Sequence, residues 1–421
     1  MRLDHLHLQN FRCYEDARFD FQPGFNLVVG VNGSGKTSLL QGVAASFSNI
    51  LHAMGSEHFP ISETDVRFTV PKFEDRLRFE RIFPLRLAAK GDTFELPNWD
   101  ISLHRNIPLP TSSTSLQIQI QQQLKTLDFS ATVDLPIISF YRANRRWLSN
   151  NTSVESALQR KDSRLDAYKN WFDAAANLKN FEDWLIGKTL ERLQRLSRTG
   201  PTNSFNDELT WVNAAIKCAL PLSNGIEYDM DLRSLMVDLG ERLIPFDDLS
   251  DGQRGVVALF ADIARRICLL NPHMGQEVLE KTSGVIIIDE LDIHLHPGWQ
   301  RSIATALKKA FPKIQFIAAS HSPQIIGSLQ PEEVILLHNG DSSHPTATYG
   351  LDSSSILEAV MGVGQRLPEI EELLNEMFTS LENNELEKAR QQLKALKKKA
   401  PDLPEYTGAE ALLRRKEIIG R

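Results

Sequence analysis

Residues Gly30 to Thr37 have the residue types and spacing of a phosphate-binding loop, GxxxxGK[ST]. Glycines allow consecutive backbone N–H groups to curl around a phosphate, and a helix that begins at Lys36 points the positive end of its dipole at the same anion. We expect Lys36 to reach the β- and γ-phosphates of a nucleotide and the Thr37 hydroxyl to bind Mg²⁺. The predicted nucleotide contacts of this loop are Gly30, Asn32, Gly33, Ser34, Gly35, Lys36, Thr37 and Ser38.

Two carboxylates, Asp289 and Glu290, directly follow the apolar run 284–288. Sheets of α/β proteins place ligand chemistry at the C-terminal ends of their strands. Asp289 is suited to hold Mg²⁺, and Glu290, which points in a different direction, is suited to orient or deprotonate an attacking water. Such a pair is common at the end of an ordinary strand, but its position after a phosphate loop favours hydrolysis of ATP, with ATP and Mg²⁺ as the cofactors.

Two shorter segments complete the pattern. Ser250, Gly252 and Gln253 lie in the segment LSDGQR, about 40 residues before the carboxylates, where a serine at a helix N-cap beside a glycine makes a second helix end that can bind an anion. His321 follows Ser320 at the end of the next apolar strand, IQFIAAS, where a histidine can contact a γ-phosphate. Each segment alone is also typical of a structural role, as a capped helix or a lone structural histidine.

A different metal site is a weaker alternative. His294 and His296 share one face only if their segment is extended, and no cysteine lies near enough in the sequence to complete a zinc site. Cys13, Cys218 and Cys268 are far apart and have no CxxC spacing, which is typical of buried thiols in a reducing cytosol.

The chemistry requires strands and helices that hold these residues in place. Alternation of apolar and polar residues predicts strands over 3–8 and within 11–21, and the apolar run 25–30 ends in the phosphate loop before a helix of about 36–51. The apolar run 135–141 predicts a strand that is buried on both faces. The other predicted elements are hairpins and a loop over 68–127, helices over 155–219 with the aromatic anchors Trp171, Phe172, Trp184 and Trp211, a strand near 232, a helix from 251 to 270, a strand over 284–289, a helix over 298–311, strands in IQFIAAS and EEVILLH, and helices from 353 onward.

Composition narrows the class of protein. The 421 residues, 42% hydrophobic and 24% charged, are typical of a soluble globular chain of two to three domains. The net charge of −7 gives no overall attraction to nucleic acid, so DNA or RNA would need a local basic patch such as Arg142, Arg145 and Arg146 or the stretch 188–198. Both patches are equally typical of solvated surfaces. No segment is long and apolar enough to span a membrane, and the N-terminus alternates like a strand, so we expect a cytoplasmic protein with no membrane partner.

The four motifs, in this order, resemble those of the ABC-type ATPases. The segments LQNFRCY, DELDIHLHPGWQ and SHSPQ resemble the SMC/RecF/OLD-like branch of that superfamily. This resemblance implies an α/β fold with an ABC-type (SMC/RecF-like) P-loop ATPase core, in which the phosphate loop of one protomer and the signature segment of a second close on the same ATP. Ser250 and Gly252 would then contact a γ-phosphate bound by the other protomer.

The same resemblance implies further roles. Asp292 would lie at the dimer seam, His321 would be the switch histidine, and Arg12 would lie close to the bound nucleotide. The sequence departs from the common pattern at Asp251, where a glycine is usual, although this branch often has the aspartate. The glutamine that usually follows the phosphate-loop helix has no clear match, and a residue within 63–65 is our candidate for its place.

Three longer segments resemble the ATPase subunit of Septu-type anti-phage systems, whose relatives are also coupled to retrons. They are LPIISFYRANRRW, RLDAYKNWFDAAANLKNFEDW and GLDSSSILEAVMGVGQRLPEIEELLNEMF. The resemblance covers nearly the whole chain and implies a homodimer or higher homo-oligomer that binds a separate HNH nuclease subunit. A reverse transcriptase and retron nucleic acid are further candidate partners.

The motifs divide the chain into four expected parts. About 100 residues follow His321, and they contain neither the acidic DxD cluster of a TOPRIM nuclease nor a His/Asn pair of HNH type, so any cutting activity is expected in a partner. Two other functions remain open, namely a RecF-like DNA-repair ATPase and a scaffold that binds ATP without turnover. The expected parts are an N-terminal ATPase lobe over 1–150, a mainly α-helical insertion over 151–230, a C-terminal ATPase lobe over 231–350, and a helical tail over 351–421 that is the candidate nuclease-docking region.

Overall fold

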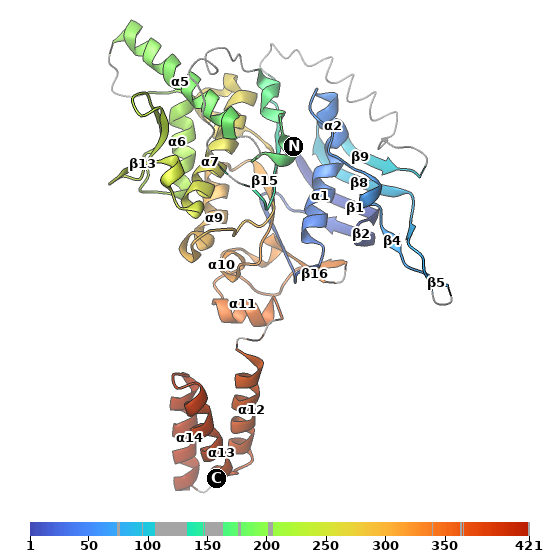
Figure 1. Cartoon of the computed structure of the whole chain (residues 1–421), viewed down its shortest axis with the longest axis vertical. Helices are drawn as coiled ribbons and strands as arrows, with labels where there is room; N and C mark the ends of the chain where they lie inside the picture. The colour runs from blue at the N-terminus through green and yellow to red at the C-terminus, as the bar shows by residue number, and fades with distance from the viewer. Residues whose placement is uncertain are drawn as a thin grey trace. The chain divides into compact units, whose positions relative to one another are not determined.

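The computed structural model describes residues 1–73, 76–94, 96–105, 133–145, 147, 163–175, 178–200, 205–338, 340–362, 364 and 366–419. These residues form two compact units, Met1–Asp352 and Ser353–Arg421. Figure 1 shows the first unit as a mixed α/β body and the second as a group of helices. Most of the predicted loop before residue 127, the start of the predicted insertion and Arg146 lie outside the described residues.

A six-stranded sheet forms the centre of the first unit, in the order β10-β14-β15-β3-β16-β17. The first five strands are parallel and β17 is antiparallel to its neighbour. Because helices shield both faces, every residue of β3, β10, β14 and β15 is buried, as their continuous apolar sequences predict. The sheet joins segments from both sides of the predicted boundary at residue 150. Its strands are β3 (Phe25–Val29), β10 (Ile137–Tyr141), β14 (Gly284–Ile288), β15 (Ile314–Ala319), β16 (Val334–His338) and β17 (Asp341–Ser343).

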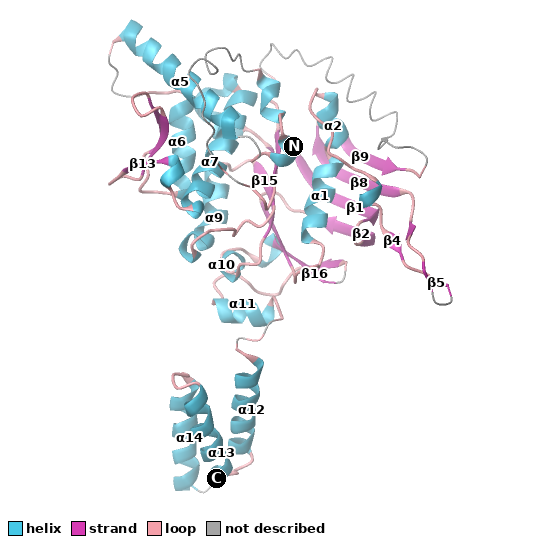
Figure 2. Cartoon of the chain, in the orientation of Figure 1, coloured by secondary structure: helices cyan, strands magenta, loops and turns pink. Residues whose placement is uncertain are grey.

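A second, antiparallel sheet has the order β2-β1-β8-β9. The alternation predicted for the first two strands is confirmed, and the two later strands, which we expected only as hairpins, run the length of β1 because they continue its hydrogen-bond ladder. Two short hairpins, β4 with β7 and β5 with β6, precede them (Figure 2). The bounds are β1 (Arg2–Phe11), β2 (Tyr14–Asp20), β4 (Phe68–Thr69), β5 (Lys72–Phe73), β6 (Arg76–Leu77), β7 (Glu80–Arg81), β8 (Leu85–Thr93) and β9 (Leu96–Leu103).

Helix α1 (Lys36–Ser46) lies between the two sheets, where it contacts β14 and β15 of one and β1, β8 and β9 of the other. We predicted a single helix to about residue 51, but α2 (Ser48–Ala53) is a separate element. Helix α1 ends at Phe47, whose N–H donates to the Ala44 carbonyl at 3.1 Å. This hydrogen bond spans three residues instead of four and so tightens the last turn of α1.

Helix α6 packs against both α7 and α9 beside the parallel sheet. Helix α7 is tied to β10 by a fully buried network in which Asp262 pairs with Arg265 and Arg266 and accepts a hydrogen bond from Tyr141 Oη at 2.9 Å. The elements of this region are α5 (Leu178–Thr199), α6 (Glu208–Ala219), α7 (Asp251–Leu270), α8 (Val278–Lys281), α9 (Pro297–Ala310), α10 (Pro323–Ile326), the strands β11 (Gly225–Asp229), β12 (Ser234–Asp238) and β13 (Leu243–Pro245), and short 3-10 helices at 63–65, 164–168, 171–173, 246–248, 272–277 and 331–333.

The predicted helical region before α7 is only partly α-helical. Residues 163–175 form 3-10 turns, in which Trp171 is fully buried, while α5 and α6 are true α-helices. Trp184 is buried as predicted, whereas Phe172 and Trp211 are only half-buried.

The second unit begins with α11 (Ser353–Ala359) and continues with α12 (Pro368–Glu382), α13 (Leu386–Lys399) and α14 (Glu405–Ile419). The last three helices share an apolar core that includes Met377, Leu396 and Ala409. The helical character predicted for this tail is confirmed, with a break at Asn384, which has a φ of 64°. Within the described part of the chain, none of the helices has the length and apolar character needed to span a membrane.

Candidate active site

The phosphate loop connects β3 to α1, as the sequence predicts, and two of its glycines adopt the left-handed conformation, Gly33 with φ 82° and Gly35 with φ 102°. This conformation turns successive backbone N–H groups toward one side, which makes an anion-binding concavity. Gly35 also has no room for a side chain, because a Cβ there would lie 2.6 Å from Tyr14 Oη and 2.9 Å from Cys13 Sγ.

Lys36 lies inside the curl of this loop. Its ammonium donates to the carbonyls of Gly30 and Val31, at 2.9 and 3.0 Å, and only 9% of the residue is exposed. Burial lowers the pKa of Lys36, while the carboxylates of Asp289, Glu290 and Asp292 act in the opposite direction. The lysine charge is therefore placed between the loop and the strand that bears the acidic residues.

The two predicted carboxylates have different environments at the end of β14. Asp289 is 4% exposed, and burial raises its pKa, although a hydrogen bond to the Thr37 side chain and the nearby cations of Arg145 and Lys36 oppose that rise. Glu290 is exposed and adopts a left-handed φ of 47°. One buried and one exposed carboxylate suit the separate roles predicted for them.

The donors at this point fit Mg²⁺. A carboxylate and a hydroxyl are hard oxygen ligands, and Asp289 and Thr37 already meet through a hydrogen bond. A divalent cation there would favour the ionised form of Asp289 against the effect of burial. When bound, Mg²⁺ would neutralise negative charge on the transferred phosphoryl group.

Arg145 is a residue of this site that sequence reasoning assigned only to a candidate nucleic-acid patch. Its guanidinium donates to the backbone carbonyls of Asp289 and Glu290, at 2.6 and 2.8 Å, and to the Arg142 carbonyl at 3.1 Å. Burial lowers the pKa of Arg145 to about 10, against the effect of the three nearby carboxylates. The feature of the sequence that could have indicated this position is the predicted buried strand over 135–141, which directly precedes Arg145. In the structure this strand, β10, pairs in parallel with β14, so the residues that follow β10 lie beside Asp289 and Glu290.

His321 follows β15, the neighbour of β14, as predicted, and its backbone and that of Ser320 are held beside Asp292. Asp292 Oδ1 accepts from Ser320 Oγ at 2.6 Å and from the backbone N–H of His321 at 3.4 Å. Burial and the nearby Lys36 ammonium lower the pKa of His321, so its imidazole is neutral at pH 7. Asp292, expected at a dimer seam, therefore also fixes the histidine of its own chain.

A cavity of about 280 Å³ brings most of the predicted residues together. The sequence predicted nine of its twelve lining residues, and those that it missed are Cys13, Ala319 and Ser320. Of these, Cys13 lies within the recognised segment LQNFRCY and Ser320 within SHSPQ. Among the described residues that line the cavity, none comes from the signature segment. The predicted lining residues are Asn32, Gly33, Gly35, Lys36, Thr37, Ser38, Asp289, Glu290 and His321.

The signature segment forms the start of α7 instead. Ser250 is its N-cap, and Ser250 and Gln253 hydrogen-bond each other as a capping box at an exposed helix end. Gly252 is buried against its own chain, because a Cβ there would lie 2.4 Å from the carbonyl oxygen of His294. The helix start is thus in contact with the loop that follows Asp289 and Glu290, while it lies outside the nucleotide cavity.

Arg12 lies beside Cys13, which lines the cavity, but its guanidinium pairs with Asp65 at 2.7 Å. The backbone N–H of Arg12 also donates to the Asp65 carbonyl at 2.7 Å. The 63–65 segment, our candidate for the missing glutamine position, is thus joined to the turn between β1 and β2.

The zinc alternative is not supported. His296 is the N-cap of α9 and its Nδ1 accepts from the Gly298 N–H at 3.2 Å, while His294 is exposed with φ 59°. Within the described ranges, no group of three or more His, Cys, Asp and Glu side chains is placed to hold a metal ion. Of the three cysteines, Cys268 is buried as expected, whereas Cys13 is exposed and Cys218 is half-buried.

Comparison with known proteins agrees with these features. A family model described as an AAA domain matches residues 5–209. The chain is 27% identical over 431 residues to the Retron Ec83 probable ATPase of Escherichia coli, a match that covers 88% of this chain and 78% of that protein. It is 24% identical over 391 residues to the Septu protein PtuA of Bacillus thuringiensis, covering 88% of this chain and 87% of that protein. The chain thus resembles the Septu and retron ATPases over most of its length.

The fold class of this PtuA-like chain follows from its own sheet order and motif positions. A solved SMC head bound to the C-winged helix domain of ScpA matches 82% of this chain and 97% of that chain, with a TM-score of 0.49 and 13% identity. Because the TM-score and the identity are this low, the fold class rests on the chain's own sheet order and motif positions. The α/β class and the resemblance inferred from the motifs are confirmed.

Proposed function

We propose that the chain is the ATP-hydrolysing subunit of an anti-phage defence complex, and that it scaffolds and regulates a separate HNH nuclease through an ATP-sandwich dimer. The defence role is supported by relatives named as a retron ATPase and a Septu protein, which align over most of this chain. A cytoplasmic setting, a reverse transcriptase and retron nucleic acid belong to the same proposal.

The observation that carries the dimer is the division of the site into two halves. The cavity collects the phosphate loop, both carboxylates and His321, while the capped start of α7, with Ser250 exposed, lies outside it. A helix start with exposed N–H groups attracts phosphate. A second copy can therefore supply Ser250, Gly252 and Gln253 to the nucleotide held by the first.

The chemistry follows from the two carboxylates. Thr37 and Asp289 would hold the Mg²⁺ shell, and the exposed Glu290 would accept a proton from the water that attacks the γ-phosphorus. The products are ADP and phosphate. His321, neutral at pH 7, can donate a hydrogen bond to the γ-phosphate without adding charge.

Replacement of Glu290 tests this function. Glu290→Gln should abolish Mg²⁺-dependent ATP hydrolysis while ATP still binds, and the ATP-loaded variant should be dimeric or larger by light scattering. Glu280→Gln, an exposed glutamate of α8 that lies before β14 and outside the cavity, is the matched control and should hydrolyse ATP at the normal rate. Unchanged turnover in Glu290→Gln would refute the role of this residue, and a monomer with bound ATP would refute the sandwich.

The nuclease partner requires a docking surface, and we propose the second unit for it. Helices α12–α14 have their own apolar core, so deletion of residues 353–421 should leave ATP binding intact and abolish co-purification with the HNH nuclease. The double variant Leu367→Ser, Ile418→Ser changes two strongly exposed apolar residues while it keeps the helices, and it should weaken the complex. Full retention of the nuclease by the deleted chain would refute docking on this unit.

The structure favours this function over a DNA-repair ATPase. Two arginines of the first candidate nucleic-acid patch bind backbone carbonyls of their own chain, Arg145 as described above and Arg142 at Phe172, at 3.0 Å. In the stretch 188–198, Lys188 pairs with Glu191 and Glu208, and Arg192 pairs with Asp207. These charges stabilise the fold of their own chain.

A further inference from the structure

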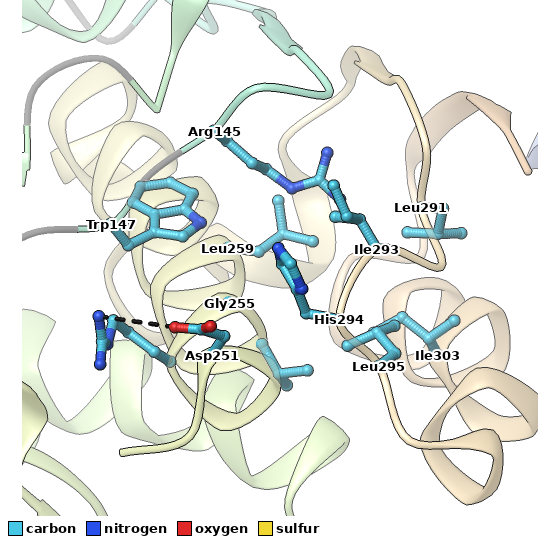
Figure 3. Close-up of a pocket in the computed structure, with 12 residues that line it drawn as sticks. Arg145, Trp147, Asp251, Gly255, Leu259, Leu291, Ile293, His294, Leu295 and Ile303 are labelled. Atoms are coloured by element: carbon cyan, nitrogen blue, oxygen red, sulfur yellow. Dashed lines mark ion pairs between the residues drawn. The ribbon is translucent and has the colours of Figure 1, made fainter. Parts of the chain in front are cut away.

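A second cavity, of about 400 Å³, lies between the start of α7, the loop after β14 and the segment after β10 (Figure 3). It shares none of its twelve lining residues with the nucleotide cavity. Small-molecule sites are mostly apolar cavities of roughly 300–1,000 Å³ with a few convergent polar groups. The second cavity has this character, because aliphatic side chains such as Leu259, Leu291 and Ile303 line it beside two arginines.

Gly255 indicates that the second cavity is kept open. Glycine inside a helix is unfavourable relative to alanine, so it needs a reason. For Gly252, one turn earlier, that reason is the close approach of the His294 carbonyl. Gly255 has no such constraint, because no described atom beyond its chain neighbours and the nearby backbone of its own helix lies within 4 Å of a Cβ built on it, and its φ is not positive. It lines the second cavity, and a larger residue there would project into that space.

Two hydrogen-bond donors in the cavity wall have no acceptor among the described residues. They are Nε1 of Trp147, which is 6% exposed, and Nε of Arg254. Nη2 of Arg254 donates to the Asp247 and Leu249 carbonyls at 2.8 and 2.9 Å, and Nη1 lies 3.9 Å from the Asp251 carboxylate. In Figure 3 the indole nitrogen of Trp147 points toward the side of Leu259 and His294. Buried donors normally have acceptors, so these two point to an acceptor supplied by a ligand.

The charges that line the second cavity define the ligand further. Arg254 is offset by Asp251, at 3.9 Å, whereas Arg145 has only carbonyl partners within hydrogen-bond distance in the described structure. The guanidinium of Arg145 therefore has no ion-pair partner within 4.0 Å in the described structure, although the carboxylates of Asp289, Glu290 and Asp292 lie nearby. The walls also present two aromatic rings, the indole of Trp147 and the imidazole of His294, which favour a flat ring system.

We propose that the second cavity binds a small planar aromatic molecule with one negatively charged group. The ring would lie on the aliphatic floor beside Trp147, and the anionic group would accept hydrogen bonds from the Trp147 and Arg254 donors near Arg145. Binding of this ligand does not depend on the proposed ATPase function, because the site and its test involve no nucleotide.

Indole-3-acetate is a probe of this chemistry, and indole-3-acetamide is its uncharged match. Isothermal titration of the full chain should show indole-3-acetate binding at one site, with the amide about tenfold weaker or worse. Saturation with ADP should not displace the acid, since the nucleotide cavity is separate. Equal affinity for acid and amide would overturn the assignment of an anionic ligand, and absence of binding by both would overturn the site.

Variants of Gly255 locate the binding. Gly255→Leu should fill the second cavity and weaken the binding of indole-3-acetate about tenfold or more. Gly255→Ala, which adds one methyl group, should change this affinity less than about threefold. Trp147→Phe, which keeps a ring but removes the donor, should also weaken binding. Gly187→Leu in α5 is the matched control, because its Cβ likewise meets open space and it lines neither cavity. Binding that survives Gly255→Leu undiminished would place the ligand elsewhere and refute the proposal.

Discussion

Replacement of Arg145 by alanine should lower both the stability of the ATPase unit and its turnover. The guanidinium donates to the backbone carbonyls of both Asp289 and Glu290. It therefore restrains the backbone that carries the buried and the exposed carboxylate of the candidate active site. A hydrogen bond from a charged donor contributes about 1.5–3 kcal/mol, so two give an upper bound of about 3–6 kcal/mol. Burial of the guanidinium, which lowers its pKa, offsets part of this stabilisation. The hydrogen bond to the Glu290 carbonyl is exposed to water and so contributes less than a buried one. We therefore expect a loss of about 2 kcal/mol.

For a unit of this size, that loss lowers the melting temperature by about 3 °C. Because the Glu290 backbone loses its restraint, kcat should fall about 10- to 100-fold while the dissociation constant of ATP stays unchanged. Arg145→Lys should recover only part of kcat, since one ammonium cannot span two carbonyls. Arg142→Ala is the control, because Arg142 binds the Phe172 carbonyl instead, and it should leave kcat unchanged. Normal melting and normal kcat in Arg145→Ala would refute the role of this residue.

Three further outcomes are expected. Gly252→Ala should destabilise the protein by about 1–3 kcal/mol in denaturant titrations, because its Cβ would lie 2.4 Å from the His294 carbonyl, whereas Gly255→Ala should not destabilise it. The pKa of His321 is lowered, so the acid limb of the kcat/KM profile should lie below pH 6.5, and His321→Gln should remove that limb. Asp262→Ala should cost about 3–5 kcal/mol, because it leaves two buried guanidiniums unpaired. Burial acts to raise the pKa of Asp262, but Arg266 and Arg265 hold that pKa below 3.8, so the contribution of Asp262 to stability is present above pH 3.8 and is lost as the pH falls through the lowered value. A melting temperature of the unmutated protein that stays constant down to about pH 2 would contradict this.

The motif residues could be placed from the sequence because their chemistry is local. A glycine-rich loop between an apolar strand and a helix fixes its own backbone, and Gly33 and Gly35 have the conformation that this requires. Fully apolar runs mark β14 and β15 as central strands, so that the residues after them were expected at one edge of the sheet.

The contacts that the sequence could not reveal all depend on which segments are neighbours. Arg145 reaches the carboxylate strand only because β10 pairs with β14, a choice that no local pattern encodes. The pairing of Arg12 with Asp65 likewise joins residues 53 positions apart. The length of β8 and β9 follows from their pairing with β1 and with each other rather than from their own irregular alternation.

The loop after β14 connects the two halves of the candidate site within one chain. At its start, Arg145 holds the carbonyls of Asp289 and Glu290; in its middle, Asp292 accepts hydrogen bonds from Ser320 and His321. Near its end, the His294 carbonyl meets Gly252 so closely that any side chain would force them apart. A displacement of the α7 start by a partner's nucleotide would therefore press on the same loop that positions Glu290. In the proposed dimer, the two nucleotides would therefore affect each other's hydrolysis.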